Sequence, residues 1–296
     1  MRKDNKLKRK GGPDLATRPQ NIRRQDKNNF SAPLISVITV VRNGKKYIKE
    51  TILSVLSQTY KNIEYIIIDG ASTDGTIEII KQYSDKIDYW ISEKDNGIYE
   101  AMNKGIKIAS GEIINFLNCG DLYENKFVVS EVMEIFKRNS KLSFVLGRGR
   151  FVNENNQPIN IFRNKPLVTT LKFGRFDDCC HQAFFYKKSL HQEFGLYDLR
   201  YKICADRLFI QKIYASKKYQ YFLLDKVLAI RRYDGLSRKP EAILESKKLY
   251  DEIFGKSLIN YFLILKYYLK QNKFRIKIYN IYEKIKYLIR KKFNAF

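Results

Sequence analysis

The sequence predicts an α/β fold with a mainly parallel central sheet flanked by helices. Between residues 34 and 118, short apolar segments rich in β-branched residues alternate with segments whose apolar residues recur at helical spacing. The short segments are apolar throughout, which is typical of strands buried on both faces of a parallel sheet. A chain of 296 residues is long enough to bury such a core.

The elements of the first half can be placed in order from this pattern. We expect strands at residues 34–41, 63–69, 88–92 and 112–118, and helices at residues 44–58, 72–84 and 97–109. Ser72 or Asp74 could cap the second of these helices. A later helix is expected to open at Asp206, where apolar residues again follow helical spacing.

Polar residues follow each of the four predicted strands, and ligands of such sheets bind beyond the carboxyl ends of the strands. These residues are Arg42 and Asn43, then Asp69, then Glu93 and Asp95, and finally Asn118 to Asp121. Asp and Asn also favour turns, so any one of them could serve turn geometry alone. Their recurrence at successive strand ends favours a polar ligand. The first turn matches neither the Gly-rich dinucleotide turn nor the P-loop, which excludes the two commonest nucleotide binders of this architecture.

From about Leu34 to Ser237 the chain resembles the family-2 glycosyltransferases. The resemblance is carried, in order, by "ISVITVVRNGKKYIKETILSVLSQTYKNIEYIIIDGASTDGT", "SEKDNGIYEAMNKGIKIASGEIINFLNCGD", "HQAFFYKKSLHQEFGLYDLRYKICADRLF" and "VLAIRRYDGLS". It implies an A-type glycosyltransferase fold, with residues 31–125 as the nucleotide-sugar-binding half and 126–255 as the acceptor-binding half of one domain. It also implies an inverting transfer from a nucleotide-diphosphate sugar, with a UDP-sugar expected, to a hydroxyl of a glycan or lipid-linked acceptor.

The resemblance assigns the donor site to residues near the strand ends. Asp69 would accept a hydrogen bond from the base, because a carboxylate is an acceptor-only group that suits a uracil-like imide. Asp74 is expected to cap or brace the following helix. Asn103 would face the nucleotide, although an exposed helical Asn would look the same in sequence. The other residues expected at the donor are Thr39, Val41, Asn43, Asn118, Gly120 and Arg232.

The segment "NFLNCGD", residues 115–121, stands where the family usually has Asp-x-Asp followed by another acid. Asn118 takes the place of the first Asp and Gly120 the second, which leaves Asp121 as the predicted metal ligand. One carboxylate, together with diphosphate oxygens and water, can satisfy Mg²⁺, and Mn²⁺ is the other cation expected. The L-N-x-G-D pattern resembles a branch of the family, and we interpret it as a variant of the site. The alternative is a non-catalytic sugar-nucleotide-binding homologue.

Inversion requires a base that removes the proton of the acceptor hydroxyl, and the resemblance assigns this role to Asp206. An acid at the start of a helix can also serve only to offset the helix dipole. His181 and Gln182 are expected to contact the acceptor, the diphosphate or the metal, although a lone His is often structural. Cys179, Cys180 and His181 are adjacent, and neighbouring strand residues point to opposite faces, so a zinc site is not expected there.

The two ends of the chain hold most of the net charge of +25. Residues 1–30 are polar and basic without hydrophobic periodicity, which predicts a disordered arm. Residues 256–296 are predicted to form a basic amphipathic helical tail. Its segment 257–292 could lie on an anionic membrane surface, which we favour, or pack on the core with its basic face in water.

No apolar run approaches the length that spans a bilayer, and no apolar signal region follows the N-terminus. We therefore predict a cytoplasmic enzyme, peripheral at the cytoplasmic face of the membrane, that acts in cell-surface polysaccharide biosynthesis. The basic ends could alternatively bind nucleic acid. The aromatic residues lie in helical apolar stripes or near the C-terminus, however, so we expect no specific nucleic-acid partner.

Overall fold

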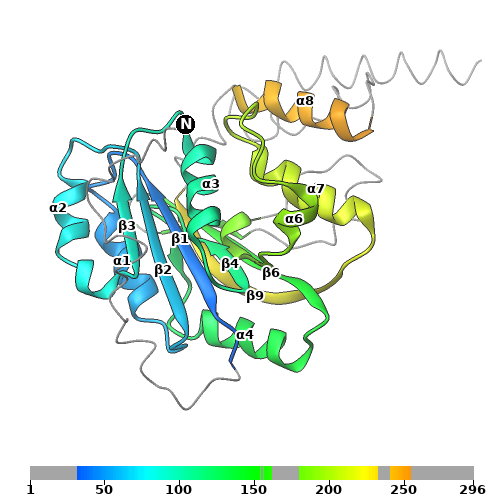
Figure 1. Cartoon of the computed structure of the whole chain (residues 1–296), viewed down its shortest axis with the longest axis horizontal. Helices are drawn as coiled ribbons and strands as arrows, with labels where there is room; N and C mark the ends of the chain where they lie inside the picture. Colours follow the sequence, from blue (N-terminus) through cyan, green and yellow to red (C-terminus); the bar gives the residue numbers. More distant parts are fainter. Residues whose placement is uncertain (1–31, 154, 156, 162–179, 233–240, 255–296) are drawn as a thin grey trace, which may run out of the picture. The chain divides into compact units, whose positions relative to one another are not determined.

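The computed structural model describes residues 32–161 except 154 and 156, residues 180–232 and residues 241–254 (Figure 1). The predicted arm and the predicted basic tail lie outside the described residues. The chain divides into two compact units. The described residues up to 232 belong to the first unit, and helix α8 (Glu241–Phe254) belongs to the second. The predicted division into a donor half and an acceptor half stays a prediction.

A mixed sheet runs through the described part of the first unit, in the order β3-β2-β1-β4-β8-β6-β9-β5 with β7 paired to β6 (Figure 1). The strands are β1 (Ile35–Val41), β2 (Ile63–Asp69), β3 (Tyr89–Ser92), β4 (Ile113–Phe116), β5 (Leu122–Tyr123), β6 (Leu142–Val152), β7 (Pro158–Ile161), β8 (Phe184–Lys187) and β9 (Gln220–Arg232). Strands β1 to β4 pair in parallel, whereas β8 is antiparallel to both β4 and β6. Strands β6 and β9 are parallel.

Helices flank the sheet, as predicted, and the α/β fold class is confirmed. They are α1 (Ile48–Leu56), α2 (Thr76–Lys81), α3 (Ile98–Ile108), α4 (Val128–Arg138), α6 (Leu190–Phe194) and α7 (Ala205–Ser216), with 3₁₀ segments η3 (Ser84–Lys86) and η4 (His181–Ala183). The first helix begins later than its apolar spacing suggested. Residues 44–47 instead form a turn, in which the Gly44 carbonyl accepts hydrogen bonds from the backbone N–H groups of Tyr47 and Ile48, each at 2.9 Å.

Helix α2 also begins later than predicted, because its N-cap is Gly75 at φ 98°. Asp74 braces the start of this helix, as expected. Its Oδ1 accepts hydrogen bonds from the backbone N–H of Thr76 at 3.0 Å and from the Thr76 hydroxyl at 2.5 Å. Its Oδ2 accepts a bond from the backbone N–H of Lys45 at 3.0 Å, which ties the turn after β1 to the turn after β2.

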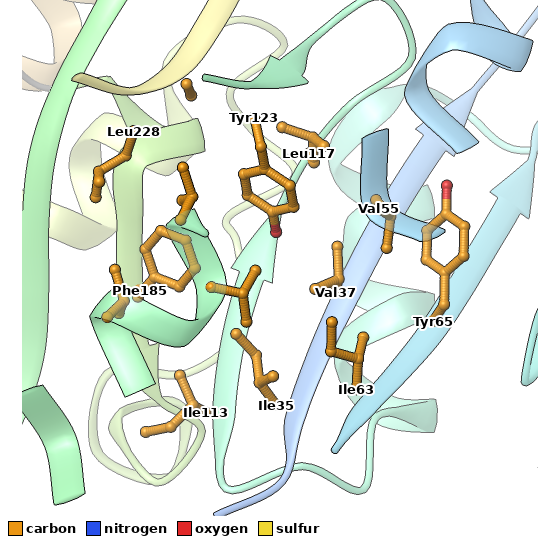
Figure 2. Close-up of a cluster of buried hydrophobic side chains, with 14 of the residues drawn as sticks. Ile35, Val37, Val55, Ile63, Tyr65, Ile113, Leu117, Tyr123, Phe185 and Leu228 are labelled. Carbon is orange, nitrogen blue, oxygen red and sulfur yellow. The ribbon is translucent and has the colours of Figure 1, made fainter. Parts of the chain in front are cut away.

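The sheet is buried on both faces. Ile35 and Val37 of β1 share a core with Ile63 of β2 and Val55 of α1 (Figure 2). On the other face α3 approaches β1 so closely that a Cβ at Gly105 would lie 2.5 Å from Ile38 Cγ2. Burial on both faces explains why β1 and β2 have continuous apolar sequences. It also leaves the carboxyl ends of the strands as the place where polar groups can gather.

Candidate active site

The parallel pairing brings the carboxyl ends of β1, β2 and β3 together at one edge of the sheet. Val41 lies opposite Asp69, and Asp69 lies opposite Ser92. The turn after β4 reaches the same edge, since the backbone N–H of Cys119 donates to the Val40 carbonyl at 3.2 Å. The turns after these four strands therefore form the candidate site.

Asp69 is fully buried, and its carboxylate accepts three hydrogen bonds. Its Oδ1 accepts from the Ser72 hydroxyl at 2.5 Å, and its Oδ2 accepts from the Ser72 backbone N–H at 2.9 Å and the Ser92 hydroxyl at 2.6 Å. Asn43 stands exposed beside it at φ 50°. The Asn43 backbone N–H donates to Ser72 Oγ at 2.7 Å, and its Oδ1 accepts from the Thr73 N–H at 2.9 Å. Asp69 thus binds neighbouring turns together, and its contact with a base stays a prediction.

Thr39 and Val41 connect β1 to its neighbours. The buried Thr39 hydroxyl donates to the Leu117 carbonyl at 2.7 Å, and the Val41 carbonyl accepts from the Gly70 N–H at 2.8 Å. The Thr39 side chain is therefore used inside the fold, and only the end of the strand at Val41 reaches the candidate site. The predicted contacts of these two residues with a donor stay predictions.

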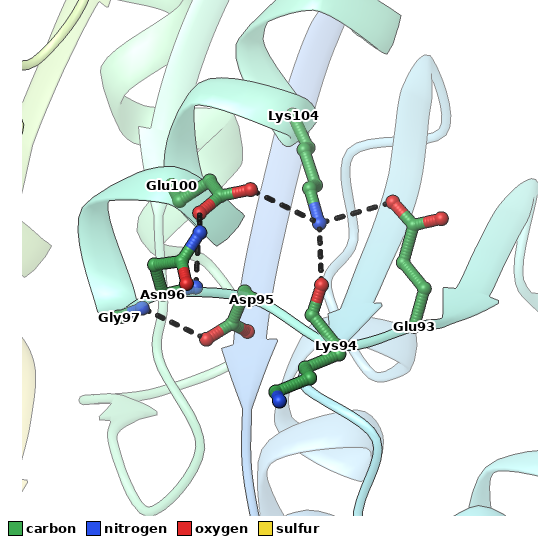
Figure 3. A network of polar contacts seen from close by, with 7 residues as sticks. All are labelled: Glu93, Lys94, Asp95, Asn96, Gly97, Glu100 and Lys104. Carbon is green, nitrogen blue, oxygen red and sulfur yellow. Dashed lines mark hydrogen bonds and ion pairs between the residues drawn. The ribbon is translucent and has the colours of Figure 1, made fainter.

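The loop after β3 is fixed by charged side chains (Figure 3). Lys104 Nζ lies 3.0 Å from Glu93 Oε1 and 3.7 Å from Glu100 Oε1, and it donates to the Lys94 carbonyl at 3.2 Å. Glu100 Oε2 accepts from the backbone N–H of Asn96 at 2.9 Å. These contacts hold the entry to α3 in place.

Asp95 of this loop is buried against the turn after β2. A Cβ at Gly70 would lie 2.4 Å from Asp95 Oδ2, so glycine is needed there for close approach. Asp95 Oδ1 accepts from the Gly97 N–H at 3.0 Å (Figure 3). Asp95 is thus packed against Gly70, the residue that follows Asp69.

His181 bridges Asn118 and Asp206 at the centre of the site. Its Nδ1 lies 2.9 Å from Asp206 Oδ2, and its Nε2 lies 3.1 Å from Asn118 Nδ2. The Tyr99 hydroxyl donates to Asp206 Oδ1 at 2.7 Å across 107 residues of sequence. Burial alone would raise the pKa of Asp206, but its interactions with His181 and Tyr99 hold that pKa well below the usual range.

Gln182 binds the predicted metal ligand. Its Nε2 donates to Asp121 Oδ2 at 2.6 Å, and its Oε1 accepts from Cys180 Sγ at 3.2 Å. Both Gln182 and Asp121 are buried. Burial raises the pKa of Asp121, and the nearby Arg231 and the bond from Gln182 offset only part of this rise. His181 therefore contacts the predicted site residues Asn118 and Asp206, and Gln182 contacts the predicted site residue Asp121.

Gly120 lies between these groups at φ 93°, a conformation that favours glycine. Its N–H donates to Thr51 Oγ1 at 2.9 Å. Arg232 lies next to this turn, with its Nη2 donating to Glu50 Oε2 at 2.6 Å and its guanidinium 4.2 Å from the Tyr47 ring centroid. Helix α1 and the turn before it thus hold Arg232, which is buried, beside the end of β4.

Asn103 has a different environment from the one predicted. Its Nδ2 donates to the Tyr197 carbonyl at 2.8 Å, and its Oδ1 accepts from the Tyr197 N–H at 2.9 Å. Both ends of the amide are therefore used to hold the chain before α7 against α3. Because a buried amide bonded in this way is a structural contact, we leave Asn103 out of the proposed donor site.

The predicted cation site at the end of β4 has one carboxylate, that of Asp121. In the described ranges, no three His, Cys, Asp or Glu side chains are arranged to hold a metal ion. Asp121 is the carboxylate expected to bind it, and one Asp121 oxygen already accepts from Gln182. A single carboxylate fits Mg²⁺ or Mn²⁺ when a diphosphate and waters supply the other oxygens. Asn118 Oδ1 is buried without a hydrogen-bond partner among the described residues, which leaves an acceptor for a ligand.

Sequence reasoning missed the residues that orient the predicted ones. Tyr99 binds Asp206, while Tyr47 and Glu50 hold Arg232 and Thr51 supports Gly120. Glu50 and Thr51 occupy ordinary positions in an amphipathic helix. Tyr99 stands in the first turn of α3, within the block that carries the resemblance, but nothing local marks its hydroxyl as different from that of a core Tyr.

Comparison with known proteins identifies the family. Residues 36–195 match the model for "Glycosyl transferase family 2". This chain belongs to glycosyltransferase family 2. An uncharacterised glycosyltransferase of Mycobacterium tuberculosis is 34% identical over 184 residues, which are 61% of this chain and 68% of that protein. A PGL/p-HBAD biosynthesis glycosyltransferase of Mycobacterium bovis is 28% identical over 180 residues, which are 60% of this chain and 68% of that protein.

Solved structures share the fold of this family-2 chain. Staphylococcus aureus TarS 1–349 in complex with UDP-GlcNAc has a TM-score of 0.59 at 20% identity, covering 80% of this chain and 71% of that one. The mannosyltransferase PcManGT of Pyrobaculum calidifontis, with GDP-Man and Mn²⁺, has a TM-score of 0.58 at 16% identity, covering 81% and 70%. The predicted A-type architecture and the prediction of a glycosyltransferase enzyme are confirmed. The motif branch and the site roles stay predictions.

Proposed function

We propose that this glycosyltransferase moves a sugar, with inversion, from a UDP-sugar to a hydroxyl of a glycan or lipid-linked acceptor in cell-surface polysaccharide biosynthesis. The observation that carries the proposal is the network in which His181 joins Asn118, at the end of β4, to Asp206, at the start of α7. The nucleotide sugars in the TarS and PcManGT structures support a donor of this class.

The donor diphosphate would lie beside the turn after β4. Arg232 would pair with the leaving diphosphate, because a guanidinium matches phosphate oxygens with several donors. Asp121 would bind Mg²⁺ or Mn²⁺, which when present stabilises the charge that develops on the leaving group. Asn118 Oδ1 is buried and available as an acceptor, which supports its predicted bond to a ribose hydroxyl.

Asp206 would act on the acceptor side. The acceptor oxygen attacks the anomeric carbon, the bond from that carbon to the diphosphate breaks, and the hydroxyl proton passes to Asp206. The interactions with His181 and Tyr99 keep the Asp206 carboxylate ionised although it is buried, and the ionised carboxylate is the form that can accept a proton. His181 and Gln182 stand between the two sides of the site and would orient Asp206 and Asp121, respectively.

A lipid-linked acceptor would require contact with a membrane. In the part of the chain that the structure describes, no helix has the length and apolarity needed to cross a bilayer. The proposed contact is peripheral, through the basic segment 257–292 on an anionic cytoplasmic surface. Co-flotation of the protein with anionic vesicles but not with neutral ones would support it, and equal recovery with both would contradict it.

A panel of sugar nucleotides tests the proposed function. Thermal unfolding of the full chain with UDP-, GDP- and dTDP-sugars, each with Mg²⁺, Mn²⁺ or EDTA, should show the largest stabilisation with a UDP-sugar and a cation. The stabilising donor is then used in transfer assays with glycan and lipid-linked acceptors. Stabilisation by a GDP- or dTDP-sugar alone would contradict the proposed donor nucleotide.

A further inference from the structure

We propose that Tyr99 and His181 are positioning residues that hold the Asp206 carboxylate ready to accept the acceptor proton, and that His181 couples this carboxylate to Asn118 on the donor side. The inference rests on the proposed function above, in which Asp206 is the base. The juxtaposition comes from four separate elements: α3, the turn after β4, η4 and α7.

Each oxygen of the Asp206 carboxylate has its own donor. Oδ1 accepts from Tyr99 at 2.7 Å and Oδ2 from His181 at 2.9 Å. A carboxylate oxygen can accept a further hydrogen bond, so both oxygens keep capacity for an acceptor hydroxyl. Two donors from different elements fix the rotation of the carboxylate about its terminal bond, which a single donor would not do. By fixing the orientation of the Asp206 carboxylate, such positioning residues raise the rate of the transfer step.

Tyr99 is itself held in place. Its ring lies 5.6 Å from the Tyr197 ring, centroid to centroid, and Tyr197 is clamped to α3 by both ends of the Asn103 amide. The two hydrogen bonds from Asn103 thus hold Tyr197 in place, and the Tyr197 ring in turn packs against the ring of Tyr99. The hydroxyl is presented to Asp206 from a packed, buried position rather than from a mobile loop.

His181 connects the two sides through its two ring nitrogens. Asp206 accepts at Nδ1, so Nδ1 carries the ring proton. Asn118 Nδ2 is a donor and faces Nε2, so Nε2 supplies the lone pair. One ring proton therefore satisfies both contacts. The amide nitrogen of Asn118 faces His181, and its Oδ1 is buried without a hydrogen-bond partner among the described residues. A hydroxyl of the bound nucleotide sugar that donates to this oxygen would fix the orientation of the Asn118 amide. The amide would then fix the His181 ring, and the ring would fix the Asp206 carboxylate.

The other histidine of the chain provides the contrast. His191 Nδ1 lies 2.8 Å from the Gly195 carbonyl, and its Nε2 lies 2.9 Å from the Tyr186 hydroxyl. Its ring stacks on Phe209 at 4.3 Å, and burial lowers its pKa to about 4. His191 therefore packs within the protein, whereas His181 contacts two residues that the motif pattern had placed in the site.

Two substitutions at one position separate the two contacts of His181. The amide nitrogen of Asn can stand near the place of the imidazole Nδ1, and the amide of Gln can reach the place of Nε2. His181→Asn can then keep the bond to Asp206, and His181→Gln can keep the bond to Asn118. We expect His181→Gln, which loses the bond to Asp206, to lower kcat about 10- to 100-fold with little change in the donor KM. We expect His181→Asn, which loses the bond to Asn118, to raise the donor KM with a smaller fall in kcat. A wild-type kcat in His181→Gln would overturn the positioning role of His181, and a wild-type donor KM in His181→Asn would overturn its coupling to Asn118.

Tyr99→Phe tests the second donor without removing the ring. Loss of the hydroxyl leaves Asp206 Oδ1 without this donor, so kcat should fall about 10-fold while the donor KM changes little. Tyr186→Phe removes a buried hydroxyl that contacts His191 and not Asp206, and its kcat should stay close to that of wild type. Thermal unfolding of both variants reports whether each is folded.

The outcomes keep the two proposals apart. If wild-type protein transfers sugar but Tyr99→Phe has the same kcat, the positioning inference is overturned and the proposed function stands. If wild-type protein transfers no sugar from any UDP-, GDP- or dTDP-sugar, the proposed function itself fails.

Discussion

Gln182 Nε2 lies 2.6 Å from Asp121 Oδ2, so a buried amide holds the carboxylate at the end of β4. The two residues come from separate parts of the sequence, 61 positions apart. Burial disfavours the charged form of this carboxylate, and the nearby Arg231 and the bond from Gln182 offset part of that effect.

Gln182→Leu should destabilise the protein by about 1–3 kcal/mol at pH 7, because it leaves a buried carboxylate without its donor. The bond stabilises the ionised carboxylate, so the loss should shrink as the pH falls and Asp121 becomes protonated. The pKa of Asp121 is raised in the folded protein. This carboxyl group therefore favours the folded state at low pH, and that contribution to stability is lost as the pH rises. Urea unfolding at pH 7 and pH 4 measures the difference. Gln211→Leu removes another buried amide, whose Oε1 has no partner among the described residues, and should cost less.

Gly120→Ala should destabilise the protein by about 1–2 kcal/mol, because φ 93° is unfavourable for a residue with a Cβ. The space itself is adequate, since the nearest side-chain atoms to such a Cβ lie at 3.8 Å. Gly120→Asn should therefore cost less than Gly120→Ala, as Asn tolerates the left-handed region better. If the two variants unfold at the same urea concentration as wild type, backbone conformation is not the reason for glycine here.

Glu50→Gln should weaken donor binding, because Glu50 holds the Arg232 guanidinium beside the end of β4. Glu50 is partly exposed, so the pair contributes modestly, and we expect a rise in donor KM of up to about 5-fold with kcat little changed. Glu78→Gln removes the same charge from the exposed side of α2 and should leave KM unchanged. A donor KM for Glu50→Gln that matches the control would show that Arg232 acts independently of Glu50.

The cation should bind together with the donor and not before it. In the described ranges the side chains offer one carboxylate at the end of β4 rather than a group of three ligands. Mn²⁺ alone should therefore barely change the Tm, whereas Mn²⁺ with UDP should raise it by more than the two separate effects together. EDTA should abolish this joint effect, and Asp121→Asn should weaken it. A large rise in Tm with Mn²⁺ alone would indicate a site built by the protein itself.

The first half of the fold could be predicted because its strands are buried on both faces, which gives continuous apolar segments with polar residues at their ends. The same segments placed Asp69 and Asn118 at the edge of the sheet. Helix starts were harder to place, since the turns at Gly44 and Gly75 use backbone hydrogen bonds and positive φ angles that apolar spacing does not report.

The partners of the site residues could not be predicted, because they are long-range contacts. Tyr99 and Asp206 are 107 positions apart, and Asn103 and Tyr197 are 94 apart. The sequence pattern around a polar helical residue does not differ between one that faces a nucleotide and one that bonds a backbone group far away in the sequence. Asp206, His181 and Gln182 were found through motif resemblance, and the structure adds what each of them touches.

Asp206→Asn tests the central claim most directly, with kcat measured on the donor and acceptor that the panel identifies. The change keeps the size of the side chain but removes the carboxylate that would accept the proton. We predict a loss in kcat of about 10²- to 10⁴-fold, while the donor-induced rise in Tm is retained. Wild-type kcat in Asp206→Asn would contradict the assignment of Asp206 as the base.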